Sequence, residues 1–203
     1  MTPIPFIVGA LAFGYICGSV PFGLLFTRWA GMGDVRSIGS GNTGATNVLR
    51  TGSKKLAFLT LLADMFKATV PLVLVGWLFD APVLGYVAAF GAFLGHLFPV
   101  WLRFKGGKGI ACFVGVTLGV GLLVGNWWGL LLFAASWLGV AFLFRYSSLA
   151  GLTATLLTPI AYFLSGSVPA AVLLAVMGLI SWISHRGNIG RLWTGTEPKI
   201  GAK

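Results

Sequence analysis

Three short polar segments interrupt an otherwise apolar chain, and each carries residue types that bind oxyanions. The first segment, residues 34–55, has the sequence DVRSIGSGNTGATNVLRTGSKK. Glycine lets the backbone turn its N–H groups toward a ligand, and hydroxyl and amide side chains add further donors. Basic residues flank both ends, so the segment predicts a cradle for phosphate or another oxyanion. Its candidate residues are Gly39, Ser40, Gly41, Asn42, Thr43, Asn47 and Arg50. An ordinary glycine-rich loop is the alternative.

The second segment, residues 95–111, has the sequence GHLFPVWLRFKGGKGIA and leads into the next apolar stretch. A helix N-terminus preceded by glycines and lysines favours anion binding. A nucleotide P-loop is not supported, because no glycine lies upstream at the required spacing and no Ser or Thr follows Lys108. A basic anchor with glycine-softened turns is the alternative interpretation. The candidate residues are Lys105, Gly106, Gly107, Lys108 and Gly109.

The third segment, residues 184–203, has the sequence SHRGNIGRLWTGTEPKIGAK and follows the last apolar stretch. In a helix, His185 and Asn188 would share one face because they are three residues apart. Arg191 adds a cationic donor close by, and Ser147 and Ser148 form a further donor group after Arg145. We therefore expect a polar, partly cationic cluster at this end of the last helix.

The composition identifies the solvent for which the chain is built. Hydrophobic residues make up 57% of the 203 residues and charged residues only 9%, with a mean hydropathy of +0.93. Soluble domains carry about 25% charged residues. Apolar stretches long enough to cross about 30 Å of hydrocarbon recur along the chain. The sequence predicts an all-α integral membrane protein, a helical bundle that forms one domain over residues 1–203.

The basic residues cluster in the polar segments, which orients the expected spans. If every basic cluster faces the cytoplasm, an even number of crossings separates each pair. This predicts about seven spans, with the N-terminus outside, retained as a first span, and the C-terminus cytoplasmic. Five spans with re-entrant segments are the alternative. The apolar stretches cover residues 4–27, 56–79, 83–102, 109–125, 127–144, 149–165 and 168–184.

The net charge of +10 arises from 14 basic and four acidic side chains. Because the basic residues lie in short loops rather than on one face of a soluble fold, nucleic-acid binding is excluded. Such loops suit an anionic substrate or membrane surface. Asp64 and Lys67 are charges within an apolar stretch, and their spacing allows them to pair in a structural role. The two cysteines indicate neither a disulfide nor a metal site.

Taken together, the polar segments resemble the PlsY family of bacterial membrane acyl-phosphate:glycerol-3-phosphate acyltransferases. The matching stretches occur in order: GSVPFGLL, DVRSIGSGNTGATNVLR, GHLFPVWLRFKGGKGIA, and HRGNIGRL followed by TGTEPK. The resemblance implies transfer of a fatty acyl group from acyl-phosphate to the sn-1 hydroxyl of glycerol 3-phosphate, giving lysophosphatidate and inorganic phosphate in phospholipid synthesis. It implies no cofactor, no metal and no obligate protein partner. It also implies a site at the cytoplasmic face of the bacterial inner membrane, among membrane lipids.

The resemblance also implies residue roles. Ser40 and Arg50 match the activity-critical pair, with Ser40 binding phosphate or the oxyanion and Arg50 a substrate phosphate. Lys105 to Gly109 match the glycerol-phosphate loop, although which loop holds which phosphate stays open. His185 and Asn188 match essential residues. His185 is the candidate general base because it titrates near neutrality, with a substrate phosphate as the alternative. Glu197 matches a structural glutamate.

A transporter of a phosphorylated or other anionic metabolite is the alternative function. Polar loops and an intramembrane ion pair would suit a transport pathway. Transporters, however, place polar groups at the membrane midplane and usually contain an internal repeat. In this chain the polar segments are predicted on one face and the halves share no convincing repeat, so the enzyme is favoured.

Overall fold

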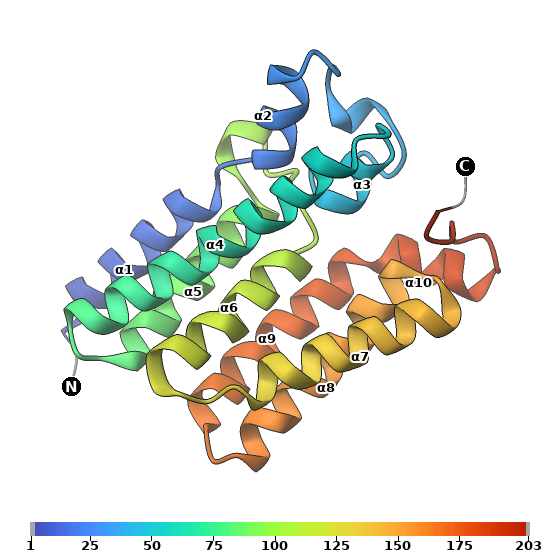
Figure 1. Ribbon diagram of the computed structural model, residues 1–203. Helices are drawn as coiled ribbons and strands as arrows, with labels where there is room; N and C mark the ends of the chain where they lie inside the picture. The colour runs from blue at the N-terminus through green and yellow to red at the C-terminus, as the bar shows by residue number, and fades with distance from the viewer. Residues whose placement is uncertain (1–2, 202–203) are drawn as a thin grey trace. The chain divides into compact units, whose positions relative to one another are not determined.

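The computed structural model describes residues 3–201 (Figure 1). Lys203, the last basic residue of the third polar segment, therefore lies outside the described residues. Within that range the regular elements are helices, which confirms the predicted all-α class. Each apolar stretch predicted from the sequence is helical, and the first stretch, residues 4–27, is divided into two helices. The helices are α1 (Ile4–Gly18), α2 (Phe22–Trp29), α3 (Ala45–Leu49), α4 (Lys54–Leu78), α5 (Pro82–Leu97), α6 (Ile110–Val124), α7 (Trp128–Phe144), α8 (Ser147–Leu164), α9 (Val168–Ser184) and α10 (Arg186–Trp193), with 3-10 turns η1 (Val35–Ser37) and η2 (Val100–Leu102).

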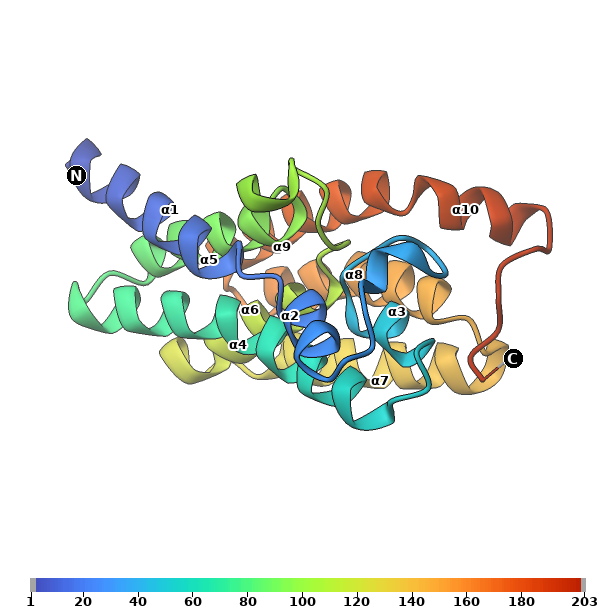
Figure 2. The same cartoon turned by 90° about the horizontal axis from the view of Figure 1, so that it is seen from above.

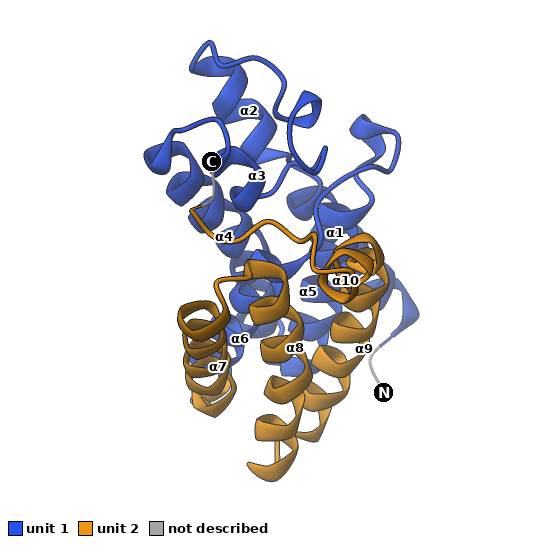
Figure 3. Ribbon diagram, turned by 90° about the vertical axis from the view of Figure 1, so that its right-hand side faces the viewer, with its two compact units in different colours: residues 1–123 blue, residues 124–203 orange. Residues whose placement is uncertain are grey.

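The chain divides into two compact units, residues 1–123 and residues 124–203, coloured separately in Figure 3. Unit 1 contains α1 to α6 and both of the first two polar segments. Unit 2 contains α7 to α10 and the third polar segment. The single domain expected over residues 1–203 stays a prediction, and each unit is described on its own.

Several helices are suited to a membrane. Among the described residues, four helical stretches are long and apolar enough to cross a bilayer: Ile4–Trp29, Lys54–Leu78, Pro82–Leu102 and Ser147–Leu164. A fifth results if α9 and α10, which meet at a bend of 63°, count as one span. The remaining apolar helices, α6 and α7, are shorter. The helices therefore support an integral membrane protein, whereas the predicted seven crossings stay a prediction.

In unit 1, α1 and α5 lie side by side, as Figures 1 and 2 show. A Cβ atom added at Gly14 or Gly18 of α1 would collide with the backbone of Ala88 or Ala92 of α5. Small residues permit such close approach in lipid, where van der Waals packing rather than the hydrophobic effect holds helices together. Glycine therefore sets the distance between these two helices.

A buried ion pair fixes α4 of unit 1 to the break between α1 and α2. Lys67 Nζ lies 2.7 Å from Asp64 Oδ1, and the two side chains are only 4% and 3% exposed. The ammonium also donates to the carbonyl oxygen of Val20, which lies in that break, at 2.8 Å. On α5, His96 Nδ1 lies 3.7 Å from the Asp64 carboxylate. The structural role assigned to Asp64 and Lys67 is therefore open to a direct test.

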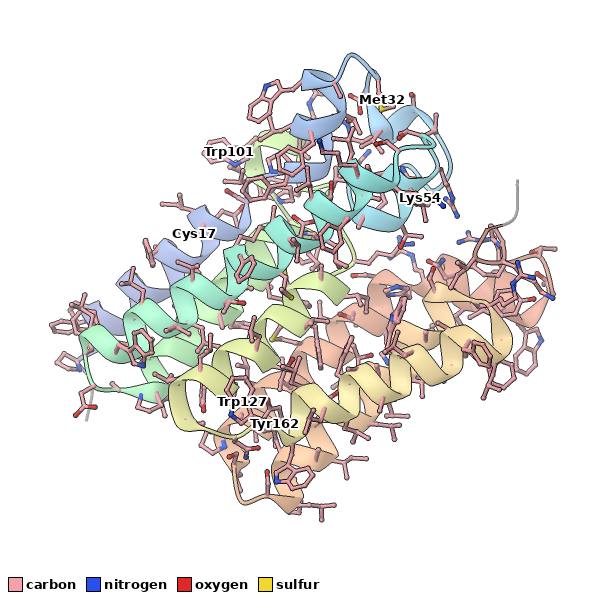
Figure 4. The ribbon with its side chains drawn as sticks, viewed as in Figure 1. Cys17, Met32, Lys54, Trp101, Trp127 and Tyr162 are labelled. Carbon is pink, nitrogen blue, oxygen red and sulfur yellow. The ribbon has the colours of Figure 1, made fainter. Side chains whose placement is uncertain are left out.

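In unit 2, the ends of α7, α8 and α9 are joined by side-chain hydrogen bonds. Asn126, before α7, donates to the hydroxyls of Ser165 and Ser167 in the α8–α9 turn, at 2.8 Å each. Figure 4 labels Trp127 and Tyr162 at this end. The α7–α8 turn at Arg145 lies at the opposite end, because α7 and α8 each run the length of the unit.

We predict that replacing Lys67 alone with Met lowers the free energy of unfolding by about 3–5 kcal/mol, since it leaves the Asp64 carboxylate buried without its cation. The double variant Asp64→Asn, Lys67→Met should regain a large part of that loss. Thermal unfolding in detergent, followed by tryptophan fluorescence, measures both. A double variant as unstable as Lys67→Met would contradict the paired structural role.

Candidate active site

The first two polar segments meet at one end of unit 1. Val35 and Val48 of the first segment form an apolar cluster with Leu24 of α2 and Ala57 of α4, and Leu102 of the second segment packs against it. Figure 4 places Met32, Lys54 and Trp101 at this same end. Apolar packing therefore places the two polar segments at the same end of unit 1.

Asp34 fastens the start of the first segment. Its carboxylate accepts hydrogen bonds from the backbone N–H and guanidinium of Arg36 and from the guanidinium of Arg28, at 2.7–2.9 Å. The hydrogen bond from Arg36 is the main cause that holds the pKa of Asp34 well below its ordinary range, against the opposing effect of burial. Asp34 is therefore ionised and holds Arg28 and Arg36 together at the start of the segment. This role was not predicted from the sequence.

Asn47 lies at the centre of the first segment. It is buried, whereas Ser40 and Arg50 are exposed at the surface of unit 1. The Asn47 side-chain oxygen accepts from the Ser40 backbone N–H at 3.1 Å and from Arg50 Nη1 at 3.3 Å. The two residues predicted to be activity-critical are thus neighbours around one amide.

The glycines of the second segment serve a close packing against α5. The N–H of Gly106 donates to the Leu97 carbonyl at 3.0 Å, and the N–H of Gly107 donates to the His96 carbonyl at 2.9 Å. A Cβ atom at Gly107 would overlap the His96 ring. Glycine is therefore required by the backbone approach, and the positive charge comes from lysine side chains, of which that of Lys105 is exposed.

In unit 2, Glu197 gathers the polar residues predicted around the third segment. Its carboxylate accepts from Ser148 Oγ and Asn188 Nδ2 at 2.6 Å each, and from Arg191 Nε at 2.7 Å. Burial raises the pKa of Glu197, but these three hydrogen bonds outweigh burial, so the net pKa is lowered. The hydroxyl of Ser148, which is predicted to bind substrate, donates its hydrogen to Glu197.

The C-terminal segment also bonds to the α7–α8 turn. The N–H of Ile200 donates to the Arg145 carbonyl at 2.6 Å, and the Arg145 guanidinium donates to the Ile200 carbonyl at 3.1 Å. Together with Glu197, these bonds hold residues 197–200 against the start of α8. The resemblance implied a structural role for Glu197, and the structure identifies the partners of its carboxylate.

His185 stands between α9 and α10 and is buried. Its Nδ1 lies 2.8 Å from the carbonyl oxygen of Ser181. A carbonyl only accepts, so this contact assigns the proton of the neutral ring to Nδ1. Nε2 is then the ring nitrogen that carries the lone pair, which is the atom that a general base would use.

The predicted site residues therefore fall into two groups. Unit 1 holds Ser40 and Arg50 beside Asn47, together with the Lys105–Gly109 segment. Unit 2 holds His185, and Asn188, Arg191 and Ser148 around Glu197. Within residues 3–201, no group of three or more His, Cys, Asp or Glu side chains is arranged to hold a metal ion. The central position of Asn47 was missed, since Asn42 and Asn47 look alike in sequence.

Comparison with known proteins decides the family. The profile of the family described as glycerol-3-phosphate acyltransferase matches residues 8–195. The chain belongs to this family. It is 58% identical to the glycerol-3-phosphate acyltransferase of Mesorhizobium japonicum over 96% of both chains. The corresponding protein of Sinorhizobium medicae is 54% identical, over 98% of this chain and 95% of the relative.

Solved structures of PlsY, an integral membrane glycerol 3-phosphate acyltransferase, are similar to this chain. The glycerol 3-phosphate form has 34% identity and a TM-score of 0.87, covering 96% of both chains. The lysophosphatidic acid form has 33% identity and a TM-score of 0.84, covering 96% of this chain and 95% of the other. The resemblance to the PlsY family is confirmed, and the chain is an enzyme of the transferase class.

The lowered pKa of Glu197 yields a prediction. Because the folded-state pKa lies below the ordinary value of 4.5, ionised Glu197 stabilises the fold above that pH, and the stabilisation is lost as the pH falls through the folded pKa. Wild type should therefore be more stable than Glu197→Gln at pH 7, and the difference should shrink below about pH 4.5. Unfolding in detergent across pH measures it. A difference independent of pH would contradict the ionised cluster.

Proposed function

We propose that the protein transfers a fatty acyl group from acyl-phosphate to the sn-1 hydroxyl of glycerol 3-phosphate, releasing inorganic phosphate and lysophosphatidate. The observation that carries this proposal is membership of the glycerol-3-phosphate acyltransferase family along nearly the whole chain. Structures of a relative in glycerol 3-phosphate and lysophosphatidic acid forms support it. The transporter alternative is not favoured by the same comparisons.

The chemistry of the reaction suits the charges of the polar segments. The hydroxyl oxygen of glycerol 3-phosphate attacks the acyl carbonyl carbon and forms a new C–O bond. The resulting tetrahedral oxyanion collapses, and the bond from the acyl carbon to the phosphate oxygen breaks. Both substrates are phosphate anions, so binding needs cationic and N–H donors, while catalysis needs oxyanion stabilisation and removal of the hydroxyl proton. Acyl-phosphate is a mixed anhydride with a good leaving group, so no covalent acyl-enzyme is required.

In unit 1, we assign Ser40 to phosphate or oxyanion binding and Arg50 to a substrate phosphate. A guanidinium binds phosphate through a fork of N–H groups, and Arg50 Nη1 already lies against Asn47. The exposed Lys105 and the segment through Gly109 are assigned to glycerol phosphate. Remaining residues proposed to shape this binding surface are Gly39, Gly41, Asn42 and Thr43.

In unit 2, two groups compete for the hydroxyl proton. One is His185 Nε2, because the Nδ1 contact with the Ser181 carbonyl leaves Nε2 as the acceptor of the neutral ring. The other is a phosphate oxygen of the substrates. Asn188 is proposed to act beside His185 with its amide oriented by Glu197. Ser147, Ser148 and Arg191 complete the residues that we propose to bind substrate in unit 2.

The proposed reaction predicts that purified protein in detergent releases phosphate from palmitoyl-phosphate only when glycerol 3-phosphate is also present, with lysophosphatidate as the second product. Phosphate release and mass spectrometry of the lipid product measure this. Phosphate release without an acylated product would indicate hydrolysis. No turnover in a monodisperse, lipid-supplemented preparation would reject acyl transfer from this donor.

Within this assay, Ser40→Ala and His185→Ala should each lower kcat by on the order of 10²-fold or more. Ser37→Ala is the matched control, because Ser37 is an exposed serine of the same segment that bonds only locally to the Asp34 carbonyl. If His185 is the base, its removal should abolish the pH dependence of kcat near neutrality. A preserved acidic limb in His185→Ala would assign the proton to phosphate.

We further propose seven crossings of a bacterial inner membrane, with the N-terminus outside and the site residues at the cytoplasmic face. In unit 1, the basic segments share one end, and Asp80 lies in the α4–α5 turn at the other. In unit 2, Arg145 and the C-terminal segment share one end, and the uncharged Asn126, Ser165 and Ser167 lie at the other. Basic residues gather on the cytoplasmic side of membrane proteins.

Single cysteines in a variant lacking Cys17 and Cys112 test this topology. Cysteines at Lys55, Lys105 and Thr196, which are exposed, should react with an impermeant thiol reagent only from the cytoplasmic side. Cysteines at Asp80 and Trp127 should react only from the outside. Labelling of Trp127→Cys from the cytoplasm alone would favour re-entrant segments and five spans.

A further inference from the structure

One buried amide organises the first polar segment of unit 1. Asn47 is 2% exposed and comes from α3. Its Nδ2 contacts three backbone carbonyl oxygens, those of Val35 at 2.7 Å, Asn42 at 2.8 Å and Ile38 at 3.2 Å. An asparagine amide has two N–H donors and one oxygen with two lone pairs. The N–H donors of the Asn47 amide are therefore all used by carbonyl groups of the loop that precedes α3.

The acceptor side of Asn47 is directed to the two residues assigned to phosphate. Oδ1 accepts the Ser40 backbone N–H at 3.1 Å and Arg50 Nη1 at 3.3 Å. Both lone pairs are thus occupied, and the side chain is almost wholly covered. No hydrogen-bonding atom of Asn47 remains for a substrate, whereas Ser40 and Arg50 are exposed.

Gly39 completes the arrangement. It adopts a left-handed conformation with φ of +55°. A Cβ atom there would collide with Asn47 Oδ1 and would lie 2.5 Å from Arg50 Nη1 and 2.6 Å from Arg50 Cδ. The Arg50 side chain therefore packs against the backbone of Gly39, and Asn47 Oδ1 accepts a hydrogen bond from Arg50 Nη1.

We propose that Asn47 is a positioning residue that holds Ser40 and Arg50 in the orientation needed to bind a substrate phosphate. Gly39 leaves the space that the Arg50 side chain occupies. This positioning role takes the place of the direct substrate contact that was predicted for Asn47 from the sequence. The proposal rests on the proposed function. A free arginine has many rotamers, so holding one nitrogen orients the rest of the guanidinium fork before substrate arrives. Bonding the Ser40 N–H likewise fixes the backbone that carries the serine hydroxyl.

The test is a double-mutant cycle on steady-state kinetics with palmitoyl-phosphate and glycerol 3-phosphate. The proteins are wild type, Asn47→Ala, Arg50→Ala and the double variant. Asn47→Ala should lower kcat/KM at least about tenfold, because misplacing a binding group by about 1 Å costs on the order of 10²-fold. In the Arg50→Ala background the same change should cost much less, since its main effect acts through Arg50.

Thr46→Ala is the matched control, because Thr46 is an exposed neighbour on α3, and its kcat/KM should stay within about twofold of wild type. Unfolding temperatures of all variants separate a local change from lost folding. A raised KM for one substrate in both Asn47→Ala and Arg50→Ala, at an unchanged unfolding temperature, would identify the phosphate concerned. If the loss of kcat/KM in the double variant equals the product of the losses in the two single variants, the proposal is overturned.

Gly39→Ala provides a second route if Asn47→Ala does not fold. The added methyl group pushes on Arg50 and Asn47 without removing any hydrogen-bonding group. It should lower kcat/KM in wild type and cost less in the Arg50→Ala background, where the long side chain is gone. Equal losses in both backgrounds would overturn the proposal. Inactivity of wild type itself would instead reject the proposed function, so the two failures are distinguishable.

Discussion

The ammonium group of Lys67 is the interaction on which the arrangement of unit 1 depends. A membrane interior offers no water, so a broken helix must find partners for its backbone inside the protein. The chain breaks between α1 and α2, and Lys67 satisfies the Val20 carbonyl there while pairing with Asp64 and lying over the Phe22 ring. The break lets α2 leave the line of α1. The direction of α2 in turn places the start of the first polar segment, which follows α2 in the chain.

The acidic residues of this chain serve mainly to hold basic ones. Of its four carboxylates, Asp34 pairs with Arg28 and Arg36, Asp64 with Lys67, and Glu197 with Arg191. The net charge of +10 still leaves a large basic excess. That excess agrees with the positive-inside rule and with substrates that are phosphate anions. The same charges thus fit both orientation in the membrane and substrate binding.

In each unit, one buried polar side chain with several hydrogen-bond partners organises the polar residues around it. In unit 1 the Asn47 amide ties together the loop carbonyls, Ser40 and Arg50, and in unit 2 the Glu197 carboxylate ties together Ser148, Asn188 and Arg191. In unit 1 the exposed Ser40 and Arg50 surround the buried amide, whereas in unit 2 Ser148 and Asn188 are themselves buried beside the carboxylate. In unit 1 the amide acts together with the apolar cluster of Val35 and Val48 to hold the glycine-rich loop.

The sequence alone determined the helices, the membrane environment and the family. Long apolar stretches have few other stable structures in lipid, so each one is helical near its predicted ends, although the first is divided into α1 and α2. The polar motifs sufficed for the PlsY resemblance because their order and spacing are specific. Length did not decide the number of crossings, since α6 and α7 have only 15 and 17 residues and about 20 span a bilayer.

Only the tertiary structure decided what each polar residue of the motifs contacts. Asn42 and Asn47 are the same residue type five positions apart, yet Asn47 alone of the two is buried at the centre of its loop. The N–H groups of Gly106 and Gly107 bond to α5, and Ser148 bonds to Glu197, 49 residues away. A sequence pattern supplies donors and acceptors, but their partners depend on which distant segments the fold brings within 3 Å.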